Sequence, residues 1–299
     1  MLDFLHIYNS PKLTGSVRVS GAKNSALPLV IAALINKNTC RIKNVPYLED
    51  IRIRLDLLRA LGAECSHEDN EVIVNASALR FHEARYGLVK RLRASFWVLG
   101  PILARLGIAK VALPGGDAIG TRPLDIHLEG LAAMGADIKL EHGVVTATAP
   151  GWLAPATIDF SFPSVGATHH LLTTAALVPG LTTLNNVAKE PEVIALAEFL
   201  QSMGARIEGA GTESIKIWGT RDLGSATTTV EGDRIEAATY LCAGIITGGN
   251  VEVRGISPHH LGEFIKVLSD MDAMVTTTDE SVRIQMRGLP KTVAVRTAP

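Results

Sequence analysis

The sequence has 299 residues, with 29 basic and 30 acidic side chains and a formal net charge of -1. This length corresponds to about two domains of ordinary size. Hydrophobic residues make up 47% and charged residues 20%, which is typical of a soluble globular protein. The near-neutral charge excludes a globally basic nucleic-acid binder, and an aromatic content of 5% argues against a base-stacking surface.

The cysteines and the N-terminus indicate a cytoplasmic location. Cys40, Cys65 and Cys242 lie far apart and form no CxxC pair, which argues against a zinc site and a disulfide framework. The longest apolar run, residues 26–35, contains Pro28 and is too short to span a bilayer. The N-terminus lacks the basic region and apolar core of a signal peptide. We therefore expect a cytoplasmic protein with no membrane insertion, no nucleic-acid partner and no metal.

The chain contains an internal repeat of about seventy residues. A Leu/Met-Gly-Ala tag has its middle residue at positions 62, 135 and 204, and a degenerate Met-Asp-Ala copy is centred on 272, so the spacings are 73, 69 and 68 residues. Each tag ends an amphipathic helical pattern that begins near a proline, at Pro46, Pro123, Pro191 and Pro258. Proline is favoured in the first helical turn, and glycine is favoured just after the last.

Each repeat predicts a strand, a helix, a strand, a second helix and two more strands. In repeat one, SVRVS (16–20) precedes an apolar helix and TCRIKNV (39–45) follows it. Alternating stretches after each tag, such as DIKLEHGVVTATA (137–149), predict a hairpin. The fold class is therefore α/β, built from repeated βαβαββ units. Residues 292–296 (TVAVR) resemble the opening strand of repeat one, so they predict a stub strand where a fifth repeat would begin.

Polar or charged residues stand where the first helix of each repeat begins: Lys23-Asn24, Arg93, Ser164 and Asp233-Arg234. A helix N-terminus carries free N–H groups and a partial positive charge, which favours anions. If several such ends converge, Lys23 and Arg93 would complete a site for a phosphate or a carboxylate. Ordinary capping by Asn24 and Ser164, with solvated basic side chains, explains the same pattern equally well.

The glycine-rich loop at residues 113–125 is a second candidate. It contains three glycines together with Asp117 and Arg122, and such loops often close over a site. A structural Ω-loop is the alternative. The loop matches neither the GxxxxGK nor the GxGxxG phosphate-binding pattern.

Two adjacent histidine pairs, His169-His170 and His259-His260, have no HExxH pattern around them. Neighbouring residues on a helix face apart, so these pairs favour structural roles over metal binding.

Six motifs carry a family resemblance: SGAKNSALP (20–28), LRASFWVLGP (92–101), LPGGDAIGTRPLDIH (113–127), PSVGAT (163–168), KEPEV (189–193) and GDRIEAATY (232–240). In sequence and order they resemble the UDP-N-acetylglucosamine 1-carboxyvinyltransferase family, the enolpyruvyl transferases that open peptidoglycan synthesis. The resemblance covers the whole chain.

The resemblance implies an inside-out α/β barrel fold of six repeats, three per domain, with a substrate cleft between the domains. Residues 22–231 would be one complete domain, and residues 1–21 with 232–299 an incomplete second one. The implied reaction transfers the enolpyruvyl group of phosphoenolpyruvate to the 3-hydroxyl of UDP-N-acetylglucosamine and releases phosphate. It proceeds by addition and elimination and needs no metal or organic cofactor.

The resemblance also implies roles for individual residues. Asp117 would be the general acid, Lys23 and Arg122 would bind phosphoenolpyruvate, and Asn24 would hold the sugar. The pocket for the nucleotide sugar would be lined by Arg93, Arg122, Pro123, Leu124, Asp125, Ile126, Phe162, Pro163, Ser164 and Val165.

Two departures from the family pattern matter. Many members have cysteine at the position of Asp117. A second catalytic aspartate and a further substrate-binding arginine belong to family motifs that would follow residue 299.

Three interpretations therefore compete: a transferase sequence cut short, a short paralogue that binds the nucleotide sugar without turnover, and a scaffold with no ligand. Because Lys23, Arg93, Asp117 and Arg122 are all present, the first two are favoured, and we expect the 299-residue chain alone to lack full activity. The oligomeric state stays open.

Overall fold

The structure is a computed structural model that describes residues 11–84, 86–89, 93–113 and 124–296, together with the single residues Phe4, His6 and Tyr8. For Leu88, Arg93 and Ala94 it describes the backbone alone. Asp117, Arg122 and Pro123 lie outside the described residues.

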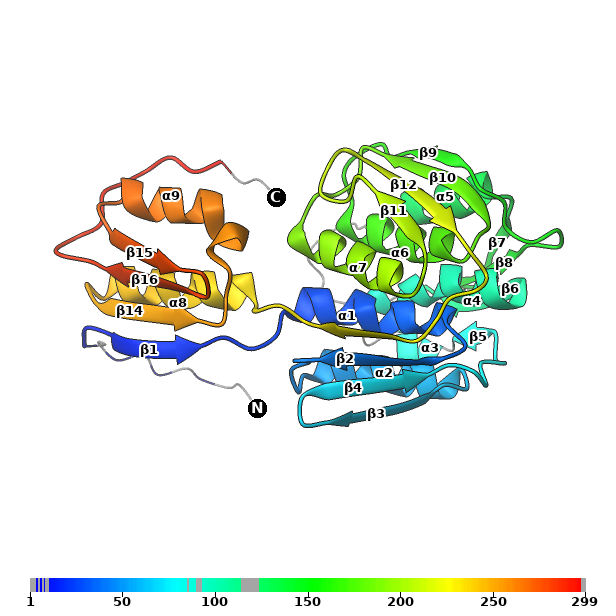
Figure 1. The fold of residues 1–299 in the computed structure, drawn as a ribbon, viewed down its shortest axis with the longest axis horizontal. Helices are drawn as coiled ribbons and strands as arrows, with labels where there is room; N and C mark the ends of the chain where they lie inside the picture. The colour runs from blue at the N-terminus through cyan, green and yellow to red at the C-terminus, as the bar shows by residue number, and fades with distance from the viewer. Residues whose placement is uncertain are drawn as a thin grey trace. The chain divides into compact units, whose positions relative to one another are not determined.

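The predicted order of elements is confirmed in all four repeats (Figure 1). Repeat one comprises β1 (Thr14–Arg18), α1 (Lys23–Ala32), η1 (Ala33–Ile35), β2 (Thr39–Lys43), α2 (Glu49–Ala60), β3 (Glu64–Glu68) and β4 (Glu71–Asn75). Repeat two comprises β5 (Glu83–Ala84), α3 (Tyr86–Val89), η2 (Arg93–Val98), α4 (Leu99–Leu106), β6 (Ile108–Ala112), α5 (Asp125–Ala133), β7 (Asp137–Glu141) and β8 (Val144–Thr148).

Repeats three and four follow the same order. Repeat three comprises β9 (Thr157–Asp159), α6 (Val165–Ala176), β10 (Gly180–Asn185), α7 (Pro191–Ser202), β11 (Arg206–Glu208) and β12 (Ser214–Gly219). Repeat four comprises β13 (Ala226–Thr229), α8 (Arg234–Ile246), β14 (Asn250–Arg254), η3 (Pro258–Leu261), α9 (Gly262–Asp270), β15 (Met274–Thr278) and β16 (Ser281–Gln285).

Within the described residues, the strands form four four-stranded sheets with one common pattern. In repeat three, β9 lies parallel to β10 at the sheet edge, β10 pairs antiparallel with β12, and β12 pairs antiparallel with β11. Repeat two builds its sheet in the same way from its own strands, in the order β5-β6-β8-β7.

Repeats one and four exchange their first strands. β1 pairs in parallel with β14, from Thr14↔Asn250 to Arg18↔Arg254, and β13 pairs in parallel with β2. Sequence periodicity does not predict this exchange, because all four first strands fit the same kind of parallel edge.

Two local expectations are wrong. Residues 292–296 form no strand, since each of the four sheets in the described chain already has a parallel first strand. In addition, α2 begins at Glu49 rather than at Pro46, whereas α7 begins at Pro191 as expected.

Contacts divide the chain into two compact units. Met1–Ala22 with Glu231–Ala298 form the small unit, and Lys23–Val230 form the large unit. In the small unit, Leu241 of α8 and Leu268 of α9 pack on Val253, Val282 and Ile284 of the sheet.

The first helices of repeats one to three form the centre of the large unit. α1 packs against α6 and α7, and α6 packs against α4. Residues 25–32 of α1 and 167–176 of α6 are all buried, which is the behaviour of a helix enclosed on every side. Figure 1 shows these helices between the sheets of the large unit. This α/β arrangement places the helix starts at Lys23, Arg93 and Ser164 in the large unit, whereas the fourth, at Asp233, belongs to the small unit.

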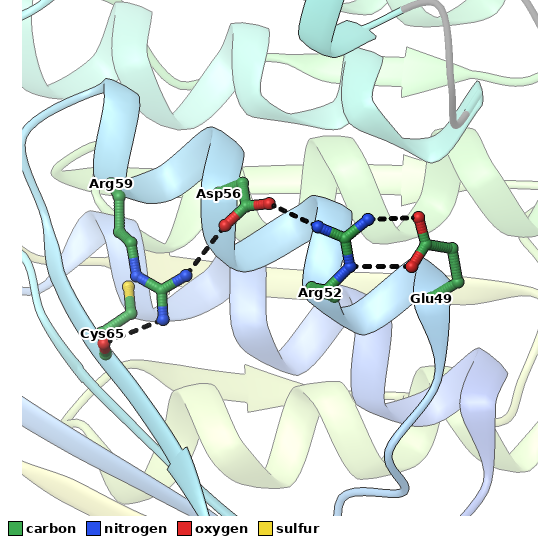
Figure 2. A network of polar contacts seen from close by, with 5 residues as sticks. All are labelled: Glu49, Arg52, Asp56, Arg59 and Cys65. Atoms are coloured by element: carbon green, nitrogen blue, oxygen red, sulfur yellow. Dashed lines mark hydrogen bonds and ion pairs between the residues drawn. The ribbon is translucent and has the colours of Figure 1, made fainter.

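The second helix of repeat one is amphipathic instead. Its outer face carries a row of ion pairs in which Arg52 bonds Glu49 and Asp56, and Arg59 bonds Asp56 and the carbonyl of Cys65 (Figure 2). Exposed pairs of this kind contribute little to stability, so we assign the row no functional role. Within the described residues, no helix has the length and apolarity needed to cross a membrane.

Candidate anion site at the helix starts of the large unit

Lys23 is the first residue of α1, and its ammonium lies beside the start of α2. Its Nζ is 2.8 Å from Oδ2 of Asp50, which stands in the first turn of α2. The Lys23 side chain is 44% exposed, and Asn24 next to it is exposed. A cation thus reaches solvent where the positive ends of two helices come together.

A second cation, Arg54, lies beneath this point. It is fully buried on α2, one turn after Asp50. Burial lowers the pKa of Arg54 to about 9, and the carboxylate of Asp50 partly offsets that effect. One carboxylate therefore lies near two cations, so the cluster of Lys23, Asp50 and Arg54 carries a net positive charge. Sequence reasoning missed Asp50 and Arg54, although Asp50 stands in the first turn of a predicted helix.

The start of α6 is capped by its own sequence. The hydroxyl of Ser164 accepts a hydrogen bond from the N–H of Ala167 at 3.3 Å. The carbonyl of Ser164 accepts from the N–H and the hydroxyl of Thr168. The prediction that Ser164 caps a helix is therefore confirmed. Phe162 and Pro163 are exposed immediately before it, and Val165 is half-buried.

The described part of the glycine-rich loop leads into α5. Leu124 precedes the helix and is half-buried, Asp125 is exposed, and Ile126 is buried. The N–H of Leu128 donates to the carbonyl of Leu124 at 3.1 Å and closes the first turn. His127 follows this segment and is buried.

These elements are neighbours in the large unit. α1 packs against η2 and α6, and α5 packs against α6, so the segments beginning at Lys23, Arg93, Leu124 and Ser164 belong to one helical assembly. Lys23 pairs with Asp50 within this assembly. Asp117, Arg122, Pro123 and the Arg93 side chain lie outside the described part of the chain.

Cys40, Cys65 and the histidine pair of α6 are buried or half-buried. Burial raises the pKa of the Cys40 and Cys65 thiols to about 11, so they stay protonated at neutral pH. His169 and His170 are both buried within α6, and His260 of η3 lies 3.2 Å from Glu231.

Comparison with known proteins decides the family. The family model for EPSP synthase (3-phosphoshikimate 1-carboxyvinyltransferase) matches residues 7–299. The chain belongs to this family.

Several relatives share the name UDP-N-acetylglucosamine 1-carboxyvinyltransferase. The protein of that name from Trichlorobacter lovleyi is 45% identical over 298 residues, which is 100% of this chain and 71% of the relative. The protein from Sulfurimonas denitrificans is 45% identical over 99% of this chain and 71% of the relative. The chain thus spans about seven tenths of the length of these EPSP synthase family members.

Solved structures of the family share the fold. The enolpyruvyl transferase NikO from Streptomyces tendae has a TM-score of 0.82 at 28% identity, covering 93% of this chain and 67% of its own. EPSP synthase from Acinetobacter baumannii has a TM-score of 0.72 at 19% identity, covering 94% and 66%. The α/β repeats described above therefore form the enolpyruvyl transferase fold.

Proposed function

We propose that the protein transfers the enolpyruvyl group of phosphoenolpyruvate to the 3-hydroxyl of UDP-N-acetylglucosamine, in the cytoplasm, as a step of peptidoglycan synthesis. The observation that carries the proposal is the 45% identity, along the whole chain, to relatives named for this activity. The cationic cluster at the starts of α1 and α2 supports it, since both substrates are anionic.

The proposed roles follow from the chemistry of the side chains. Lys23 would neutralise charge on phosphoenolpyruvate together with Arg122, because charge-assisted hydrogen bonds to phosphate and carboxylate are the strong ones. Asp50 would hold the Lys23 ammonium in place at 2.8 Å. Asn24 would contact the sugar.

Asp117 would act as the general acid. It would deliver a proton to the methylene carbon of phosphoenolpyruvate while the sugar 3-hydroxyl oxygen bonds to the neighbouring carbon and passes its own proton to a base, the second aspartate that the family resemblance implies. Departure of phosphate and transfer of a proton from the new methyl group to a carboxylate would then restore the double bond. This sequence needs no resident metal or organic cofactor.

The nucleotide sugar would lie along three segments of the large unit: Arg93, the stretch from Arg122 through Pro123, Leu124 and Asp125 to Ile126, and the stretch from Phe162 through Pro163 and Ser164 to Val165. We further propose that residues 22–231 act as one complete three-repeat domain, with residues 1–21 and 232–299 contributing to a second.

Ligand binding to residues 1–299 tests the proposal. Isothermal titration calorimetry should detect UDP-N-acetylglucosamine, and shikimate 3-phosphate should give no heat. Binding of shikimate 3-phosphate without UDP-N-acetylglucosamine, or binding of neither, would overturn it.

A further inference from the structure

Two buried histidines from different repeats form a hydrogen-bonded pair in the large unit. His127 stands in α5 directly after Ile126, and His170 stands in the middle of α6. Their side chains are almost fully enclosed, at 5% and 1% exposure. The two Nδ1 atoms lie 3.1 Å apart, and the backbone N–H of Gly100 lies 2.8 Å from Nε2 of His170.

This geometry fixes the positions of the imidazole protons. A backbone N–H can only donate, so Nε2 of His170 must be the acceptor and carries no hydrogen. The hydrogen of a neutral His170 is then on Nδ1, which donates to Nδ1 of His127. His127 therefore carries its own hydrogen on Nε2. A proton added to Nε2 of His170 would face the Gly100 N–H, so the arrangement requires a neutral ring.

The helices around the pair approach closely. A Cβ at Gly100 would lie 1.9 Å from the Thr174 hydroxyl and 2.7 Å from Nε2 of His170, and a Cβ at Gly130 would lie 2.3 Å from Leu171. The ring of Phe96 meets His127 edge-on, with centroids 5.9 Å apart at 87°. Glycines thus let α4 and α5 lie directly on α6, which leaves the imidazoles little freedom.

The histidine pair lies at the first turn of α5, which has no side-chain cap of its own. Leu124 occupies the N-cap position, and its apolar side chain cannot accept a hydrogen bond from the first turn. Gly100 is the second residue of α4, so its N–H also belongs to a first turn. One imidazole, that of His170, therefore joins the first turns of two helices to the middle of a third.

We infer that His127 and His170 are positioning residues, which hold the first turn of α5 against α4 and α6 so that Leu124, Asp125 and Ile126 meet the nucleotide sugar in a preformed arrangement. The inference rests on the proposed function for the identity of the ligand. The positioning itself can be measured without any ligand.

The adjacent His169 supplies a matched control. It is on the same helix and equally buried, and its ring packs edge-on against Trp97 rather than against the pair. His170→Phe and His127→Phe remove the pair, whereas His169→Phe removes a buried imidazole without touching it. His170→Gln keeps one acceptor and one donor on the side chain and should restore part of the function.

Hydrogen exchange and imidazole NMR give the ligand-free test. The nitrogen spectrum should place the hydrogen on Nδ1 in His170 and on Nε2 in His127. Exchange of the Leu128 amide, which closes the first turn of α5, should be about tenfold faster in His170→Phe and His127→Phe, in line with the loss of one buried hydrogen bond. It should be unchanged in His169→Phe. The opposite tautomers, or equal exchange in all three variants, would overturn the inference.

Affinity for UDP-N-acetylglucosamine gives the second test. The dissociation constant should rise about tenfold in His170→Phe and His127→Phe, and His170→Gln should recover most of the loss. Affinity for phosphoenolpyruvate should not change, because the segment that the pair holds belongs to the nucleotide-sugar pocket. If the unaltered protein binds no UDP-N-acetylglucosamine, the proposed function fails while the exchange measurement still decides the positioning role. An equal loss in His169→Phe would reduce the pair to ordinary core packing and contradict the inference.

Discussion

Lys23 carries the proposed anion site on a side chain that is 44% exposed and bonded to Asp50. Exposed ion pairs contribute at most about 1 kcal/mol, so Lys23→Met should lower the free energy of unfolding by less than that amount. It should nevertheless weaken phosphoenolpyruvate binding at least about tenfold, because a charge-assisted hydrogen bond is lost. Calorimetric titration and urea unfolding measure the two effects separately.

Lys291 offers a matched control for Lys23. Its Nζ also lies 2.8 Å from an aspartate, Asp272, but Lys291 belongs to the small unit. Lys291→Met should leave phosphoenolpyruvate binding unchanged. Equal losses in both variants, or no loss in Lys23→Met, would remove Lys23 from the site.

The buried histidines of α6 predict a pH dependence of stability. Burial lowers the pKa of His169 to about 4, and it lowers the pKa of His170 well below the ordinary value of 6.5. Below pH 6.5 the unfolded chain therefore takes up protons that the folded chain does not. The contribution of the two neutral histidines to the free energy of unfolding is fully present above pH 6.5. It falls toward pH 4, by about 1.4 kcal/mol per pH unit for each histidine.

Urea unfolding at pH 7, 6 and 5 tests this dependence. His169→Phe should reduce the slope by the share of one histidine, about 1.4 kcal/mol per pH unit. A free energy of unfolding that stays constant from pH 7 to pH 5 would mean that neither ring resists protonation.

At the scale of residues, the helix starts were predictable. Lys23, Asn24 and Ser164 stand where apolar helical patterns begin, and Ser164 caps α6 as its residue type suggests. The partners Asp50 and Arg54 could not be selected, since several charged residues share α2 and only the packing shows which face is buried. The His127–His170 contact joins positions 43 residues apart, a pairing that periodicity within one helix does not contain.

At the scale of elements, the repeated tag predicts how helices end. Gly62, Gly135 and Gly204 have φ angles of 102°, 92° and 115°, which residues other than glycine rarely adopt. The fourth repeat reaches a similar conformation with Asp272, at φ 69°. The tag therefore marks a backbone requirement that recurs after the second helix of each repeat.

Two of these glycines differ in their surroundings and allow a paired prediction. A Cβ at Gly135 meets nothing within 4 Å, whereas a Cβ at Gly62 would lie 2.8 Å from the carbonyl oxygen of Ala78. Gly135→Ala should cost about 1–2 kcal/mol from backbone strain alone. Gly62→Ala should cost clearly more, because the backbone around Ala78 must shift as well. Urea unfolding of the two variants measures the difference, and equal losses would show that strain alone decides both sites.

The elements were more predictable than their pairing. Proline, glycine and alternating apolar residues located the helices and hairpins, and the order β-α-β-α-β-β is confirmed. The exchange of β1 and β13 is a long-range choice between similar parallel edges, and the local pattern of SVRVS does not distinguish them. The missing strand at 292–296 has the same origin, since a strand-like pattern forms a strand only beside an available edge.

At the scale of the whole molecule, the two units bury their central helices unequally. Residues 25–32 of α1 are all buried in the large unit, whereas the comparably apolar α8 of the small unit exposes Ile235 at 53% and Ile246 at 81%. Apolar surface left in water contributes none of the roughly 25 cal/mol per Å² that burial provides. We therefore expect the small unit to be the less stable of the two.

Hydrogen exchange at neutral pH tests this expectation, with the amides of α8 opening at least about tenfold faster than those of α1, which corresponds to about 1.4 kcal/mol. Two substitutions on α8 separate its faces. Leu241→Ala removes a fully buried side chain and should cost about 2–5 kcal/mol, so exchange should accelerate across the whole small unit. Ile246→Lys replaces an exposed side chain and should change the free energy of unfolding by less than about 0.5 kcal/mol. Equal protection of α8 and α1, or a large loss in Ile246→Lys, would show that the outer face of α8 is covered in solution.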